Sequence, residues 1–278
     1  MAGDVPMAGL TFFGSGGGRF VAITQVRSTG GFLLEDGTRI HVDPGPGAVV
    51  WSNRWGHDPR RLDGVVVSHA HPDHYIDVEV LIEAMTSGAT VRRGVLAASR
   101  SVIYGNDRYG PVITRYHLDR VGSVVALYPG VVTHIGSVRI EATPAKHNDP
   151  DTVGLLFDTS FGRVGYVSDT EFFEGIERVY RGSCVLILSL TRPGNLRIPW
   201  HLCTEDAIGI VESVKPDLVL PLHFGMRMVH SNPVKEAERI ERETGVRTVP
   251  VVDGMVVKFD ESAGFKVVAP SVPSLSGF

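Results

Sequence analysis

The segment Ser68-His-Ala-His-Pro-Asp-His74 decides both the fold and the chemistry of this chain. It follows Gly64-Val-Val-Val67, a β-branched apolar run that is typical of a buried strand. Alternate residues of a strand share one face, so His69 and His71 can point together into one cavity where the strand ends. The Asp and His that close the segment leave the turn in another direction and could hold a second ion. Because imidazole and carboxylate are ligands of divalent metals, the segment predicts a metal site.

The pattern His-x-His-x-Asp-His resembles the motif of the metallo-β-lactamase superfamily of metallohydrolases. The chain also carries His147, Asp169 and His223, each directly after a strand-like apolar run, in the order that this family requires. The resemblance implies two metal sites with one bridging carboxylate. One ion would take His69, His71 and His147, the other Asp73, His74 and His223, and Asp169 would bridge them.

Within that superfamily, the chain is most similar to ribonuclease Z-like phosphodiesterases. Three segments carry this similarity: Phe12–Gly18, Gly165–Thr170, and His201–Ala207. In such enzymes the histidine before the Thr-Glu helix is an active-site residue but not a metal ligand, and His201 matches it. The resemblance runs from about residue 10 to about residue 259. The part of the chain from Gly225 to Met255 is also similar to small uncharacterised prokaryotic members of the superfamily. This second similarity indicates no particular substrate.

The resemblance implies an α/β fold, a four-layer αββα sandwich with two mixed β-sheets flanked by helices. The chain has 278 residues, 43% of them apolar, which suffices for one large core. With no linker in view, we expect one hydrolase domain over residues 1–262, followed by a C-terminal strand or tail over 263–278. Local patterns predict strands over 10–13, 20–26, 32–34, 39–42, 124–127, 138–142, 153–157, 164–167, 218–222, 248–252 and 256–259, and helices over 76–85, 205–214 and 233–244.

Charge and cysteine content bear on the partners and the location. A net charge of −4 provides no global basic field that would attract long nucleic acid. The two cysteines, Cys184 and Cys203, suggest no disulfide framework, which fits a reducing cytoplasm. The N-terminus does not read as a signal peptide, and no apolar run has membrane-spanning length. We therefore expect a cytoplasmic protein whose substrate is a small-molecule or nucleic-acid phosphodiester. Related enzymes often form homodimers.

Three polar or glycine-rich features have more than one interpretation. Gly14–Gly18 could line the cleft, but Arg19 occupies a position where the dinucleotide fingerprint needs glycine, and a strand is expected to follow. Asp43 could brace the metal loop or only form a turn before Pro44. Asp149, two residues after His147, is read as part of a polar turn rather than as a substrate contact.

The chemistry implied by the resemblance is hydrolysis by a metal-bridging hydroxide. Asp73 would orient the hydroxide as well as bind metal, and His201 would protonate the leaving oxygen or stabilise negative charge. Zinc is the first expectation, and manganese or iron would suit the same ligands. RNA, a nucleotide or a small cyclic phosphodiester could be the substrate. A lactone or ester hydrolase, a mononuclear iron thiol oxygenase, and a non-catalytic metal-binding protein stay open as alternatives.

Overall fold

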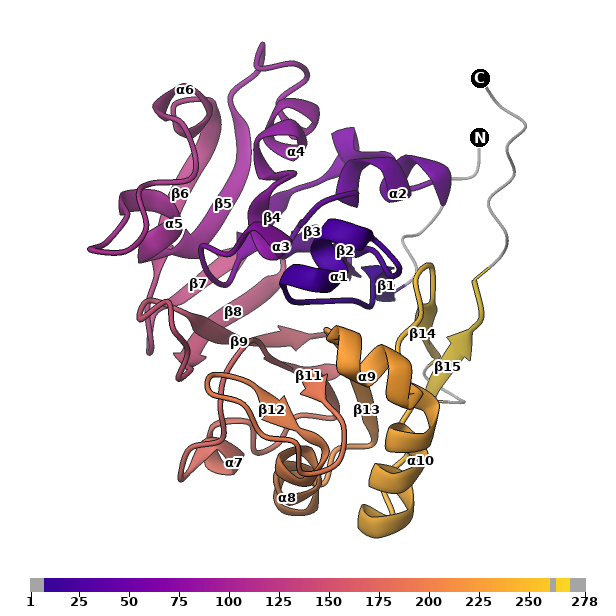
Figure 1. The fold of residues 1–278 in the computed structure, drawn as a ribbon. Helices are drawn as coiled ribbons and strands as arrows, with labels where there is room; N and C mark the ends of the chain where they lie inside the picture. The colour runs from indigo at the N-terminus through magenta and orange to yellow at the C-terminus, as the bar shows by residue number, and fades with distance from the viewer. Residues whose placement is uncertain (1–7, 261–263, 271–278) are drawn as a thin grey trace.

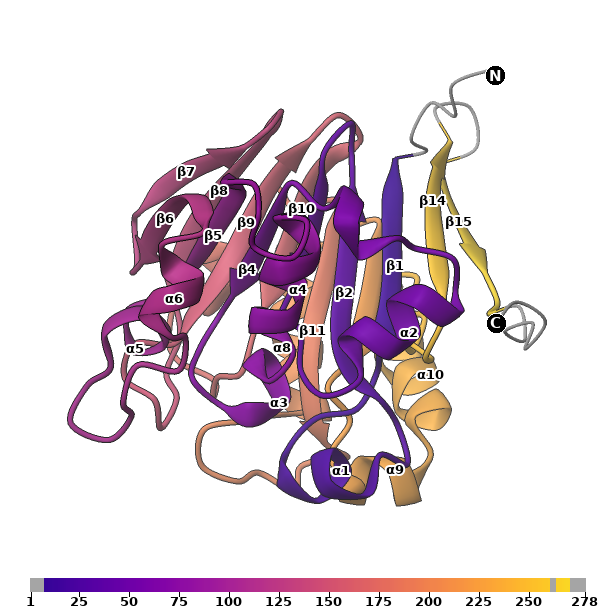
Figure 2. The same cartoon turned by 90° about the horizontal axis from the view of Figure 1, so that it is seen from above.

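Two β-sheets pack face to face, and helices cover both outer faces (Figures 1 and 2). This arrangement is that of a computed structural model, which describes residues 8–260 and 264–270. Both sheets contain parallel and antiparallel neighbours, so the expected four-layer sandwich with two mixed sheets is confirmed. Of the C-terminal strand or tail predicted over 263–278, residues 264–268 form a strand, and residues 263 and 271–278 lie outside the described residues.

The first sheet has the strand order β15-β14-β1-β2-β3-β4-β5-β6. Neighbours from β15 to β3 are antiparallel, and those from β3 to β6 are parallel. β15 extends the sheet through β14, so the C-terminal strand packs with the rest of the chain. The strands are β1 (Gly9–Gly14), β2 (Thr29–Glu35), β3 (Arg39–Val42), β4 (Gly64–Val67), β5 (Arg93–Ser99), β6 (Val121–Leu127), β14 (Val256–Asp260) and β15 (Gly264–Val268).

The second sheet has the order β12-β11-β10-β9-β8-β7, and β13 pairs with β11. β10, β11 and β13 run parallel, so their C-terminal ends lie at the same edge of the sheet. The strands are β7 (Val132–Ile135), β8 (Val138–Pro144), β9 (Val153–Thr159), β10 (Gly162–Val167), β11 (Val185–Arg192), β12 (Leu202–Cys203) and β13 (Leu218–Leu222).

Helices from the first half of the chain lie over the first sheet, and those from the second half lie over the second sheet or at its edge (Figure 1). The helix predicted over 233–244 is confirmed as α10, which Asn232 caps by accepting a hydrogen bond from Val234 N, with Pro233 in the first turn. The helices are α1 (Arg19–Thr24), α2 (Ala48–Arg54), α3 (Pro72–Tyr75), α4 (Val78–Met85), α5 (Arg100–Tyr104), α6 (Arg115–Leu118), α7 (Ile176–Val179), α8 (Thr204–Val214), α9 (Met226–Ser231) and α10 (Pro233–Thr244), with a 3₁₀ turn η1 (Pro59–Arg61).

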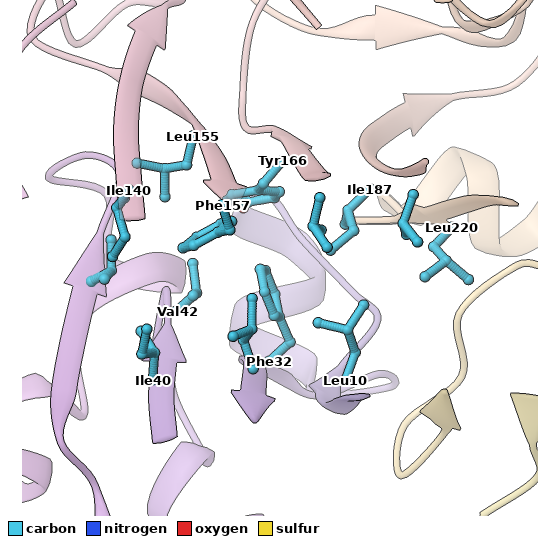
Figure 3. Packing of buried hydrophobic residues seen from close by; sticks show 14 of the residues in the cluster. Leu10, Phe32, Ile40, Val42, Ile140, Leu155, Phe157, Tyr166, Ile187 and Leu220 are labelled. Atoms are coloured by element: carbon cyan, nitrogen blue, oxygen red, sulfur yellow. The ribbon is translucent and has the colours of Figure 1, made fainter. Parts of the chain in front are cut away.

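Strand β4 shows why apolar residues run without interruption before the metal motif. Val66 faces the core between the two sheets, whereas Val65 and Val67 face the helices, where they pack with Leu81 and Ile82 of α4. A strand covered on both faces needs apolar residues at every position. Figure 3 shows the inter-sheet core, in which side chains from both sheets interdigitate.

Two predicted strands are wrong. Residues 20–26 contain helix α1 instead, because β1 pairs directly with β2 and leaves the connecting segment beyond the sheet. Residues 248–252 run beside β13, where Val249 N and Val251 N donate to Val219 O and Pro221 O. Val219 N donates back to Arg247 O, but Pro221 of β13 has no N–H to donate to Val249 in turn, so only an isolated bridge forms.

Phe32 tests the contact between the sheets. Its buried ring lies edge-on to Tyr166 of the opposite sheet, with 5.3 Å between ring centroids. We expect Phe32→Ala to lower the free energy of unfolding by about 3–5 kcal/mol, measured by urea denaturation. The exposed Tyr104 provides the control, because Tyr104→Ala should change it by less than about 0.5 kcal/mol. Similar losses in both variants would contradict this account of the core.

Candidate metal centre

Loops that follow strands of both sheets converge at one edge of the sandwich. The segment after β4 brings His69 and His71, and the segment after β8 brings His147. His71 Nδ1 lies 2.9 Å from His69 Nε2 and 3.2 Å from His147 Nε2. These three imidazoles form a compact group with Asp169, which follows β10.

A second group lies beside the first. It contains Asp73, His74 and His223, the last of which follows β13. The Nε2 atoms of His74 and His223 are 3.1 Å apart, and His223 Nε2 is 3.3 Å from Asp73 Oδ2. The structure thus brings together all seven residues predicted as ligands.

The Asp169 carboxylate lies between the two groups. Its Oδ2 is 4.0 Å from His69 Nε2 and 3.8 Å from His147 Nε2, while its Oδ1 is 3.2 Å from His223 Nε2. Its Oδ1 is buried and makes no hydrogen bond within the described residues. An unpaired buried carboxylate oxygen is costly unless another group, such as a cation, contacts it.

The spacing of the donor atoms fits divalent metal. Two ligands about 2.0–2.1 Å from a tetrahedral zinc ion lie roughly 3.3 Å from each other. The nearest-neighbour separations within the groups, 2.9 Å for His69–His71 and 3.1 Å for His74–His223, lie near that value.

The ionisation of the first group also fits metal binding. Burial lowers the pKa of His69 well below its usual value, and the neighbouring imidazoles lower it further. Burial likewise lowers the pKa of His71, and that of His147 to about 4. These rings are therefore neutral near pH 7, the form that offers a lone pair to metal.

The second group attracts positive charge. Burial disfavours the charged form of His74, but the carboxylates of Asp73, Asp169 and Asp43 outweigh it and raise its pKa well above the usual value. Burial would raise the pKa of Asp169, yet His223 and His74 hold it well below its ordinary range. Ionised carboxylates in a buried site favour a cation, whether a proton or a metal ion.

Asp43 holds the segment that carries the first histidines, and the ring of His74, in place through hydrogen bonds. Its Oδ2 accepts hydrogen bonds from Ser68 Oγ at 2.7 Å and Tyr166 Oη at 2.8 Å, and lies 2.9 Å from His74 Nδ1. Its Oδ1 accepts from the backbone N–H of Ser68. Of the two interpretations of Asp43, the bracing role is therefore the one that the geometry supports. A carboxylate that holds the far nitrogen of a histidine fixes its ring orientation.

The polar turn predicted at Asp149 is present, since Thr152 N donates to Asp149 O, but Asp149 itself does not lie on the surface. Its carboxylate is fully buried and accepts hydrogen bonds from Ala70 N at 2.9 Å and Ser101 Oγ at 2.6 Å. It also accepts from Asn106 Nδ2, in the loop that carries Tyr109. Asp149 therefore ties the loop of His147 to the segment between His69 and His71.

Tyr109 is a neighbour of the site that sequence reasoning missed. Its hydroxyl lies 2.9 Å from His71 Nε2, on the opposite side of that ring from the metal group. Tyr109 belongs to a loop with no motif spacing, so its position depends on how the loop folds. Asn106 Oδ1 shapes that loop by accepting from the backbone N–H of Tyr109.

The glycine-rich loop after β1 contacts two of the candidate ligands, Asp73 and His223. Gly18 N donates to Asp73 Oδ2 at 2.6 Å, which fixes that carboxylate. A side chain at Gly17 would overlap the ring of His223. His223 itself has φ 58°, a left-handed conformation that is strained for histidine and is common at functional sites.

His201 lies at the rim of this centre. Its Nε2 is 3.6 Å from Asp169 Oδ2, and its Nδ1 is 3.1 Å from Pro199 O. Burial alone would lower the pKa of His201, but Asp169 outweighs burial and raises it. His201 belongs to neither group of candidate ligands.

Comparison with known proteins agrees with this geometry. The profile of the beta-lactamase superfamily domain matches residues 38–224. The chain belongs to the beta-lactamase superfamily. An uncharacterised protein of Methanocaldococcus jannaschii is 41% identical over 252 residues, which cover 90% of this chain and 94% of that protein.

Solved structures of the superfamily share the fold. The metallo-beta-lactamase fold protein YhfI of Bacillus subtilis superposes with a TM-score of 0.74 at 20% identity, covering 90% of this chain and 98% of YhfI. The short form of human tRNase Z superposes with a TM-score of 0.62 at 12% identity, covering 91% and 99%. At these identities the likeness establishes the metallo-β-lactamase fold alone.

Across residues 8–260 and 264–270, no helix combines the length and the apolar character needed to cross a bilayer.

The bracing role of Asp43 can be measured directly. Asp43→Asn replaces one acceptor oxygen by an amide, so we expect affinity for zinc to fall by about 10- to 100-fold, measured by competition with a chromophoric chelator. Tyr166→Phe removes one donor to Asp43 but leaves its contact with His74, and should lower affinity less. Unchanged zinc affinity in a folded Asp43→Asn protein would rule out this role.

Proposed function

We propose that this protein is a dinuclear metal-dependent hydrolase that cleaves a phosphodiester. The observation that carries the proposal is the buried Asp169 carboxylate, which lies between two groups of histidines and contacts both. One group would consist of His69, His71 and His147, and the other of Asp73, His74 and His223. Zinc is the metal we propose first, because neutral imidazoles dominate the first group, and manganese or iron would suit the same ligands.

Two divalent ions at such a site supply a water of lowered pKa and polarise the oxygens at the reacting centre. Asp73 would bind metal and also orient the attacking water, because Gly18 N holds its Oδ2 in place. His71 is held between the site and Tyr109, so its Nδ1 stays directed at the centre. The groups that would hold and orient the attacking water are therefore positioned before substrate binds.

His201 would act on the leaving side. It lies beside Asp169 yet outside both ligand groups. Its Nδ1 lies within hydrogen-bonding distance of Pro199 O. With Nδ1 protonated toward that carbonyl, Nε2 faces the site and can donate a proton to the departing oxygen. A phosphodiester is the substrate class that this arrangement and the ribonuclease Z-like segments favour together.

Metal content and hydrolysis, measured on the same preparation, test the proposal. We expect two equivalents of zinc or manganese and turnover of bis(p-nitrophenyl) phosphate. One equivalent of iron without turnover would indicate a thiol oxygenase instead. Two metals with cleavage of lactones, but not of phosphodiesters, would indicate an ester hydrolase, and two metals without hydrolysis a binding protein.

Substitution of a ligand and of the acid should have different effects. His69→Ala should lose both metal and turnover, because the first group then lacks a buried donor. His201→Ala should keep its metal and lose turnover of substrates whose leaving oxygen needs a proton. The exposed His230 on α9 gives the matched control, and His230→Ala should retain both.

The leaving group provides a further distinction for His201. We expect His201→Ala to slow cleavage of thymidylyl-thymidine by about 10²- to 10⁴-fold, the usual contribution of a general acid. The loss should be smaller for p-nitrophenyl esters, whose leaving group departs without a proton. Normal turnover of both substrates in this variant would exclude the proposed role.

A further inference from the structure

A cavity of about 540 Å³ opens beside His201. One wall is formed by Glu171 and Phe172, which follow Asp169 along the chain, and another by residues 197–199, which precede His201. Asp206 of α8 completes the lining. The cavity therefore borders the residue that faces the leaving group, and its volume falls within the range of about 300–1,000 Å³ that is typical of small-ligand sites.

The wall of this cavity contains an aromatic ring that the core does not bury. Phe172 is 45% exposed, whereas the next residue, Phe173, packs against the hydrophobic core under α8. Ile198 and Pro199 add apolar surface next to it. An exposed ring beside a reacting centre offers a stacking platform for a planar group.

The charged groups around the cavity are already paired with one another. Arg197 donates from Nε and Nη2 to Asp206 Oδ1, at 2.9 and 2.7 Å. Glu171 Oε1 lies 2.6 Å from Lys146 Nζ. Because each cation has its own carboxylate, the cavity has little surplus positive charge to bind a second phosphate.

Hydrogen-bonding capacity nevertheless remains at the rim. Within the described residues, Arg197 Nη1 has no hydrogen-bond partner, since its two contacts with Asp206 use the other nitrogens. Asp206 is already saturated, because Arg197 donates twice to its Oδ1 and Cys203 twice to its Oδ2. Glu171 contacts Lys146 through Oε1 and accepts from Trp200 N through Oε2, so its carboxylate keeps free lone pairs. An uncharged planar ring with polar edges matches both the stacking wall and these groups.

We infer that this cavity is a subsite for a nucleobase, so that the substrate is a nucleoside-bearing phosphodiester. The inference rests on the proposed function for the position of the phosphate, which would lie at the metal centre. The base would stack on Phe172, and its polar edge would reach Arg197 or the Glu171 carboxylate. The connection of the base through ribose to phosphate would place the scissile ester next to His201.

Equilibrium binding to the metal-loaded full-length protein tests the subsite without any turnover. The probes are adenosine 5′-monophosphate and ribose 5-phosphate, which differ only in the base, and the method is isothermal titration calorimetry. We expect the wild-type protein to bind the nucleotide more tightly. Phe172→Ala should weaken nucleotide binding by about 5- to 150-fold and leave ribose 5-phosphate binding unchanged.

Two further variants separate stacking from general effects. Phe172→Trp keeps a ring in the cavity and should retain nucleotide binding. Tyr128→Ala removes a ring of similar exposure that does not line the cavity, and should change neither dissociation constant. Phe172 is half-exposed, so its replacement should leave the unfolding transition where it is.

The outcomes distinguish the subsite from the proposed function. Equal affinity for the two probes, no binding of the nucleotide, or an unchanged nucleotide affinity in Phe172→Ala would each overturn the subsite, even if bis(p-nitrophenyl) phosphate is hydrolysed. Phe172-dependent nucleotide binding without hydrolysis of any phosphodiester would support the subsite and contradict the proposed function.

Discussion

The contact between the inner faces of the two sheets fixes the position of every candidate ligand. His69 to His74 follow β4 of the first sheet, whereas His147, Asp169 and His223 follow β8, β10 and β13 of the second. A slip of one residue between strands would displace a ligand by about 3.3 Å, the spacing of the donors themselves. The interdigitated apolar side chains prevent such a slip, because close-packed interiors do not deform gradually. Precise placement of polar groups at the edge thus depends on apolar packing between the sheets.

Buried hydrogen bonds then convert this coarse placement into a defined site. Asp43 links the first sheet to Tyr166 of the second and to His74, while Asp149 links three loops around His71. Neither carboxylate belongs to the groups that could hold metal. Each nevertheless holds a candidate metal ligand, or the segment that carries one, in a fixed orientation. The centre is therefore supported by two anions whose own hydrogen bonds are satisfied, as buried charges require.

The sequence predicted the strands whose two faces are both buried, because an unbroken apolar run admits few alternatives. The segment before His69 and the strand before His223 are of this kind. The motif spacing likewise indicated residues that the fold brings together. Prediction was wrong for residues 20–26, because an apolar composition does not reveal that no neighbouring strand is within reach. Tyr109 was missed for a related reason: its place depends on the hydrogen bonds of Asn106, and no periodic pattern records them.

The connection from β11 to α8 carries both Arg197 and His201, whereas Phe172 stands on a separate segment after β10. Under the roles proposed for Arg197 and His201, changes within the first connection would alter recognition and proton transfer together, so selection could rarely improve one without disturbing the other. A change at residue 172 would alter recognition without moving His201. During divergence within the family, new substrates would therefore be acquired most readily through the segment after Asp169, while the connection before α8 would change slowly.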